Sequence, residues 1–132
     1  MVKDVEKLLV MLNKLGTVCG RTRFQKMVFL LKEKEGLEWR YSFIPYFYGP
    51  YAHDLQLEID LLEAAGFIRV EHQKDNLYVH SLTEQGVKVA ERIAHQMDFT
   101  EFKKLLKKLE KYNERSTKSL ITESKKLAGM SG

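Results

Sequence analysis

Apolar residues recur every three or four positions between residues 3 and 15, and this spacing predicts an amphipathic helix that ends at Gly16. A second helix is predicted from Thr22 to Gly36 by the same periodicity. Thr22 and Gln25 have the spacing of a capping box, in which two side chains satisfy free backbone N–H groups of the first turn. The first third of the chain is therefore predicted to be helical.

The pattern changes over residues 39–51, which hold seven of the fourteen aromatic residues. Aromatic and polar side chains alternate over residues 39–43, and this period of two predicts a short strand. The pair Gly49-Pro50 is expected to end the strand. Pro50 suits the first position of a third helix, because its missing N–H has no partner there, and Gly66 is expected to end that helix.

Two strand-like runs, residues 67–73 and 77–82, flank a polar three-residue turn and predict a β-hairpin. Thr83 is predicted to cap a fourth helix whose apolar face extends to Met97. A fifth helix, which starts near Phe99, has an apolar stripe opposite a lysine-rich face.

The order of these elements predicts an α+β, mainly helical fold. Three helices followed by a β-hairpin are typical of a winged helix-turn-helix, in which the hairpin is the wing and the third helix is the recognition helix. The strongest local support for a winged helix comes from residues 61–93, where the predicted hairpin is followed by Leu-Thr-Glu-Gln-Gly and a helix. The alternative is another small α+β domain that contains such a hairpin. Residues 1–113 are expected to form the winged-helix domain with additional C-terminal packing or dimerisation helices, and residues 114–132 a polar, flexible tail.

Charge is distributed unevenly along the chain, although the formal net charge is only +4. Residues 51–97 carry eight acidic and four basic residues, whereas the segments on either side are basic. The predicted third helix has four carboxylates and neither lysine nor arginine. Phosphates would repel it, so a conventional recognition helix is disfavoured.

DNA binding could still use basic residues at the start of the second helix and on the wing. A helix N-terminus also favours a phosphate. The candidate nucleic-acid-binding residues are Arg21, Arg23, Lys26, Arg69 and Lys74. The alternative is that these residues only form a solvated face.

The aromatic segment and the acidic helix that follows it could instead bind a protein. Tyrosines are enriched at interfaces, and an acidic surface suits a basic partner, such as a toxin that itself binds nucleic acid. The candidate protein-binding residues are Tyr46, Tyr48, Tyr51, His53 and Asp54. The alternative is that the aromatic residues belong to the core or line its rim.

Residues 21–66 resemble the YwgA-like family of winged-helix proteins, which is related to the Panacea (SocA-like) antitoxin domain. The resemblance depends on two clusters, Arg23-Phe24-Gln25-Lys26 and Tyr48-Gly49-Pro50-Tyr51. It implies winged-helix ancestry and, for Panacea domains, neutralisation of a toxin by binding. The chain departs from Panacea domains in its tyrosine-rich Gly-Pro-Tyr form and its basic C-terminal helix, so the antitoxin role does not transfer directly.

The remaining residues favour a binding protein that is not an enzyme, with no cofactor and no metal. The sequence has no CxxC, HExxH, glycine-rich phosphate loop or nucleophile elbow. Cys19 cannot form an internal disulfide, which suits the cytoplasm, and no membrane association is expected. The expected function is a DNA-binding protein of transcriptional-regulator type, and the alternative is an antitoxin-type protein-binding module. A homodimer is expected, because terminal helices often pair across dimers of this kind.

Overall fold

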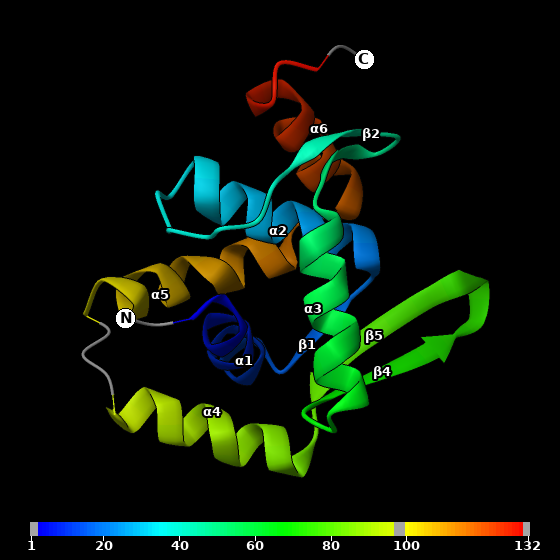
Figure 1. Cartoon of the computed structure of the whole chain (residues 1–132). Helices are drawn as coiled ribbons and strands as arrows, with labels where there is room; N and C mark the ends of the chain where they lie inside the picture. The colour runs from blue at the N-terminus through cyan, green and yellow to red at the C-terminus, as the bar shows by residue number, and fades with distance from the viewer. Residues whose placement is uncertain (1–2, 97–99, 131–132) are drawn as a thin grey trace.

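The helices form where apolar residues recur at helical spacing, and they enclose one core together with a small antiparallel sheet (Figure 1). The computed structural model of the chain describes residues 3–96 and 100–130. The elements are α1 (Asp4–Leu15), β1 (Thr17–Cys19), α2 (Arg21–Glu33), β2 (Ile44–Tyr46), β3 (Gly49–Tyr51), α3 (His53–Ala64), β4 (Ile68–Gln73), β5 (Leu77–Leu82), α4 (Glu84–Gln96), α5 (Thr100–Glu114) and α6 (Thr117–Leu127). The mostly helical α+β class is thus confirmed. None of the helices in the described residues is both long and apolar enough to span a membrane.

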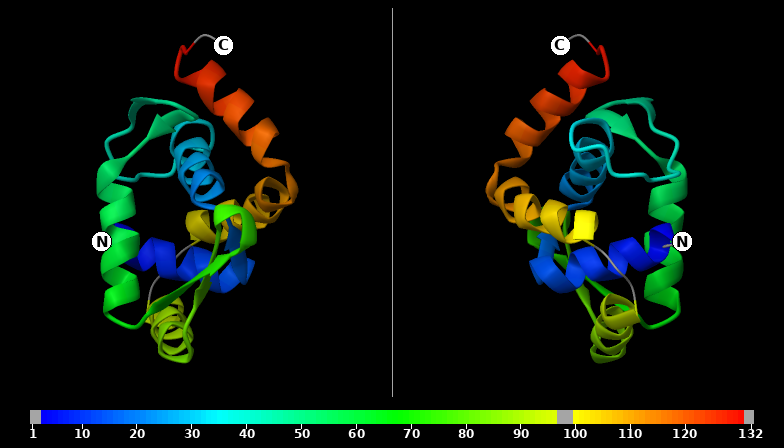
Figure 2. Two further views of the ribbon diagram at one scale, coloured as in Figure 1. Left: turned by 90° about the vertical axis from the view of Figure 1, so that its right-hand side faces the viewer. Right: turned by 90° about the vertical axis from the view of Figure 1, so that its left-hand side faces the viewer.

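Helix α2 lies at the centre of the molecule. In both views of Figure 2 it runs between the β2–β3 hairpin and the C-terminal helices α5 and α6. Every residue from Phe24 to Leu31 is buried, including the polar Gln25 and Lys26. A helix that is buried on all sides has no solvated face, so its polar residues must find partners inside the protein.

The main sheet has the strand order β1-β5-β4, with all neighbours antiparallel. Strands β4 and β5 form the predicted hairpin, which a 3₁₀ turn over Lys74–Asn76 closes. The predicted cap of α4 is confirmed, because the Gly86 N–H donates to Thr83 Oγ1 at 3.0 Å. Strand β1, which the sequence analysis missed, pairs Val18 with His80 of β5.

The predicted strand over residues 39–43 is wrong. The alternation reflects burial, since Trp39 and Tyr41 are buried and Arg40 is exposed, but the backbone is irregular. The backbone N–H groups of this segment, which would pair with a neighbouring strand, donate to side-chain carboxylates instead. The Arg40 N–H donates to Asp4 at 2.9 Å, and the Ser42 N–H donates to Asp54. The strand forms further along, at β2.

The predicted starts of the second and third helices also need correction. Helix α2 follows Gly20 without a side-chain cap, and Gln25, which was expected to complete a capping box with Thr22, is turned into the core. Pro50 does not open a helix. It lies in β3 opposite Pro45, and the two-stranded β2–β3 hairpin tolerates both prolines because its outer edges need no ladder partner.

The expected flexible tail over residues 114–132 contains a docked helix. Ser116 caps α6 by accepting the Ser119 N–H, and Leu120 is fully buried against the core where α6 packs on α2. Glu123 accepts hydrogen bonds from Arg115 at 2.6 Å and from Lys34 at 2.8 Å. The predicted apolar positions Met97 and Phe99 lie outside the described residues.

Candidate functional site

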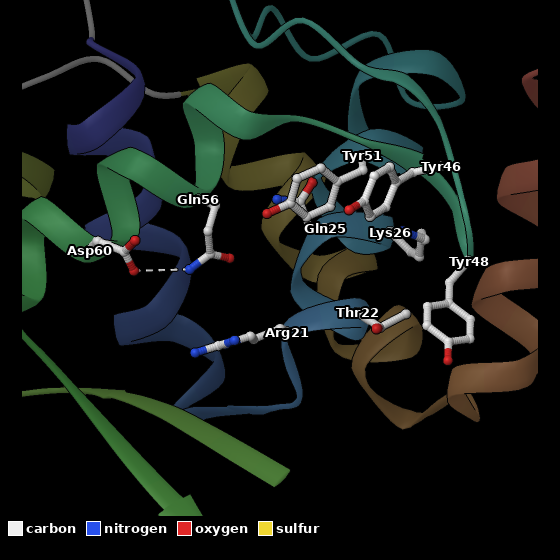
Figure 3. A pocket seen from close by; sticks show the side chains of 9 residues that line it. All are labelled: Arg21, Thr22, Gln25, Lys26, Tyr46, Tyr48, Tyr51, Gln56 and Asp60. Carbon is white, nitrogen blue, oxygen red and sulfur yellow. Dashed lines mark hydrogen bonds between the residues drawn. The ribbon is translucent and has the colours of Figure 1, made fainter. Parts of the chain in front are cut away.

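A pocket of about 370 Å³ opens between the start of α2, the β2–β3 hairpin and α3 (Figure 3). Helix α2 contributes Arg21, Thr22, Gln25 and Lys26 to its lining. The hairpin contributes Tyr46, Tyr48 and Tyr51, and α3 contributes Gln56 and Asp60. We call this site the tyrosine pocket. Its volume is in the range of small-molecule sites.

Two buried polar side chains of α2 fix the hairpin in place. Gln25 donates to the Ala52 carbonyl and accepts from the Ala52 N–H, both at 2.9 Å. Lys26 Nζ donates to the Pro50 carbonyl at 2.9 Å. Gly49 allows this approach, because a Cβ there would lie 3.3 Å from Lys26 Cε and its φ of 108° disfavours other residues. The two motifs that carry the family resemblance are therefore in direct contact.

Lys26 is a buried cation without a carboxylate partner in the described part of the chain. Burial, with a smaller contribution from the nearby Lys125, lowers the pKa of Lys26 to about 8. Its charged form is therefore destabilised in the folded protein relative to the unfolded chain.

Release of the Lys26 proton should contribute a rise of about 2 kcal/mol to the free energy of unfolding between pH 8 and pH 10. In this range the unfolded chain, with the ordinary lysine pKa of 10.5, still binds the proton that folded Lys26 has released. Stability therefore increases with pH until the unfolded lysine also titrates. Urea denaturation at several pH values measures the slope.

Lys26→Met should remove this rise, whereas the exposed Lys118→Met should keep it. As pH approaches 10 the raised pKa values of the buried Tyr41 and Tyr112 act in the opposite direction, but they do so equally in both variants, so the difference between the variants isolates Lys26. A wild-type slope that persists in Lys26→Met would assign the effect to another group.

Tyr46, Tyr51 and His53 form one connected aromatic group. Tyr46 and Tyr51 stack with their centroids 5.1 Å apart, and His53 meets Tyr51 edge to face at 4.9 Å. Burial raises the pKa of Tyr51, and the neighbouring Tyr46 and Asp60 raise it further. Tyr48 is 63% exposed at the mouth of the pocket. The rings provide an aromatic wall with hydroxyl groups at its edge.

The opposite wall carries charged and amide groups, and two of them, Gln56 and Asp60, are not among the candidate residues predicted from the sequence. Gln56 Nε2 donates to Asp60 Oδ1 at 3.0 Å. Their spacing of four residues, together with His53 three residues earlier, places them on one side of α3, and that spacing was the available signal. Arg21 lies beside them with its guanidinium 3.6 Å from the Tyr78 ring centroid.

The five candidate nucleic-acid residues are not brought together. Arg21 and Lys26 line the tyrosine pocket, but the Lys26 ammonium faces a carbonyl in the interior. Arg23 donates to the carbonyls of Asn113 at 2.6 Å and Arg115 at 2.5 Å, and so holds the corner between α5 and α6. Arg69 is exposed on β4, and Lys74 is exposed in the turn between β4 and β5.

Of the five candidate protein-binding residues, four gather at one place. Tyr46, Tyr48, Tyr51 and His53 lie together around the hairpin, as their ring contacts and shared pocket show. Asp54 has another role. Its carboxylate accepts the Ser42 N–H at 3.2 Å and so fixes the loop that precedes β2.

The two histidines of the β4–β5 hairpin do not face each other. His80 lies opposite Val70, and its Nδ1 donates to the Val18 carbonyl at 3.1 Å. Burial lowers the pKa of His80. His72 stacks on Tyr78 at 4.6 Å. Within residues 3–96 and 100–130 no three or more His, Cys, Asp or Glu side chains are grouped in a way that could hold a metal ion.

Comparison with known proteins finds a relative in Bacillus subtilis (strain 168), named "Uncharacterized protein YwgA". It is 34% identical over 90 residues, which cover 65% of this chain and 53% of that protein. The chain thus spans about half the length of this relative. The match agrees with the resemblance to YwgA-like proteins. No family model and no solved structure matches the chain.

Proposed function

We propose that the chain is a protein-binding module of winged-helix type, related to the YwgA-like and Panacea proteins. Support for this fold comes from the order α1-β1-α2-α3-β4-β5 and the sheet order β1-β5-β4, in which a three-helix unit is followed by a hairpin wing. The β2–β3 hairpin is then an insertion between the second and third helices. It carries the proposed binding surface.

The observation on which the proposal depends is an exposed apolar ridge on this hairpin. Its residues are Ile44 (45% exposed), Tyr46 (48%), Phe47 (80%) and Tyr48 (63%). Large apolar side chains grouped in this way on a surface are typical of interaction sites. Gln25 and Lys26 fix the hairpin, so little conformational entropy would be lost on binding.

Helix α3, which follows the hairpin directly along the chain, adds an acidic surface. Leu57 and Leu61 are each 58% exposed, and the same helix carries the exposed acids Asp60 and Glu63. A partner that combines apolar and basic side chains would complement this surface. The same acids would repel DNA phosphates, which favours a protein partner of antitoxin type over a DNA duplex.

The product of a gene adjacent to the one encoding this chain is the first partner to test. Phe47→Ser combined with Tyr48→Ala should weaken its binding by about 30-fold or more, because exposed aromatic anchors are typical hot spots. Leu77→Ser, which changes an exposed apolar residue of the wing (38% exposed), is the matched control and should leave affinity unchanged. Calorimetric titration measures both.

Duplex DNA provides the competing outcome. The proposal fails if the chain binds duplex DNA, Arg69→Ala and Lys74→Ala each flatten the dependence of log affinity on log salt by about one, and the ridge substitutions have no effect. Sedimentation of the same samples tests the expected homodimer separately.

A further inference from the structure

The inner wall of the tyrosine pocket presents both signs of charge. Arg21 and Asp60 line it from different helices, and within the described residues they form no ion pair with each other. Figure 3 shows the Arg21 side chain reaching to the same end of the pocket as Gln56 and Asp60. A ligand at this end must therefore offer both acceptors and donors.

The Gln56–Asp60 hydrogen bond determines which atoms remain available. An ionised carboxylate can only accept a hydrogen bond, so the Gln56 atom that lies 3.0 Å from Asp60 Oδ1 must be the amide nitrogen. The other amide atom, Gln56 Oε1, is therefore left as an acceptor. In Figure 3 that oxygen points toward Tyr51. In the described part of the chain, neither Gln56 Oε1 nor Asp60 Oδ2 accepts a hydrogen bond. Two free acceptors therefore lie beside one cationic donor.

Guanine matches this set of groups better than the other nucleobases. Its N1–H and N2–H₂ are neighbouring donors for the two acceptors, and its O6 and N7 are the acceptors that arginine commonly binds. The tyrosine wall provides a surface on which a base can stack. A volume of about 370 Å³ accommodates one nucleotide and no longer segment.

The other end of the pocket suits a sugar and phosphate. Thr22 and Tyr48 lie there with their hydroxyl groups, as Figure 3 shows. Lys26 lines the same pocket, and although its ammonium donates to the Pro50 carbonyl, its positive charge favours an anion here.

We propose that the tyrosine pocket binds a guanine nucleotide, with Arg21, Gln56 and Asp60 recognising the base. This inference goes beyond the proposed protein-binding function. The nucleotide is either a free mononucleotide or a guanine in single-stranded nucleic acid, because both present the same base edges.

Calorimetric titration with GMP, AMP, CMP and UMP tests the selectivity. GMP should bind at least about tenfold more tightly than the others. Asp60→Asn should weaken GMP binding about tenfold or more, because an amide presents a donor where guanine needs an acceptor. Glu63→Gln, an equivalent change on α3 outside the pocket, should leave GMP affinity unchanged, and thermal unfolding of both variants checks their folding.

Two further measurements are needed. One distinguishes a free nucleotide from a single strand as the ligand, and the other distinguishes nucleotide binding from the proposed protein binding. A single-stranded RNA pentamer with a central guanine, compared with its adenine counterpart, shows whether a strand binds better than GMP. Phe47→Ser, which alters the ridge outside the pocket, should leave nucleotide binding intact. The inference is overturned if neither GMP nor the pentamer gives saturable binding up to about 1 mM, if the four nucleotides bind equally, or if Asp60→Asn and Glu63→Gln have equal effects.

Discussion

Replacing Gly86 by alanine should lower the free energy of unfolding by about 3 kcal/mol or more. A Cβ at this position would lie 2.0 Å from the carbonyl oxygen of Phe67 and 3.3 Å from Leu82 Cβ. The oxygen belongs to the backbone and already accepts the Thr83 N–H at 3.1 Å, so it cannot move without loss of that bond. Helix α4 would have to shift away from the sheet.

Thermal and urea denaturation measure this effect. The midpoint of thermal unfolding should fall by about 10 °C. Glu91→Ala, which shortens an exposed side chain of the same helix, is the control and should change stability by less than about 0.5 kcal/mol. Equal stability of Gly86→Ala and Glu91→Ala would mean that α4 does not approach the Phe67 carbonyl as closely as the structure indicates.

The region around Gly86 was predictable because its signals are local. The hairpin, the polar turn and the Thr83 cap depend on residues a few positions apart, and the structure has all three. The predicted strand over residues 39–43 failed because its N–H groups bond to Asp4 and Asp54, which are distant in sequence. Alternating burial alone does not distinguish a paired strand from a loop whose backbone is satisfied by carboxylates.

The candidate site was also predictable only where its signals are local in sequence. Its tyrosines stood out by composition, and four of the five candidate protein-binding residues do lie together. The sequence predicts that Arg23 and Lys26 are available to phosphates, because it shows their charge and does not show their burial. Both are held by backbone carbonyls once α2 becomes the central helix. The spacing of Gln56 and Asp60 on α3 does not by itself indicate a pocket, because the other lining residues come from α2 and the hairpin, which are distant in sequence.

Leu120→Ala should lower the free energy of unfolding by about 3 kcal/mol, since it removes a fully buried side chain where α6 packs on α2. Leu127→Ala, which changes a half-exposed leucine of the same helix, should cost much less. Urea denaturation of the two variants gives the comparison, and equal small losses would show that α6 contributes little to the folded state.

The effect of Leu120→Ala should extend to the hairpin, because α6 also packs on β3 and Lys125 Cγ lies 3.4 Å from where a Gly49 Cβ would be. Hydrogen exchange should therefore accelerate at the amides of Ala52 and Tyr51 as well as in α6. Leu127→Ala should leave exchange at these hairpin amides unchanged. If exchange accelerates in α6 alone, Gln25 and Lys26 fix the hairpin without help from the C-terminal helix, and the proposed binding surface would depend only on residues 21–66.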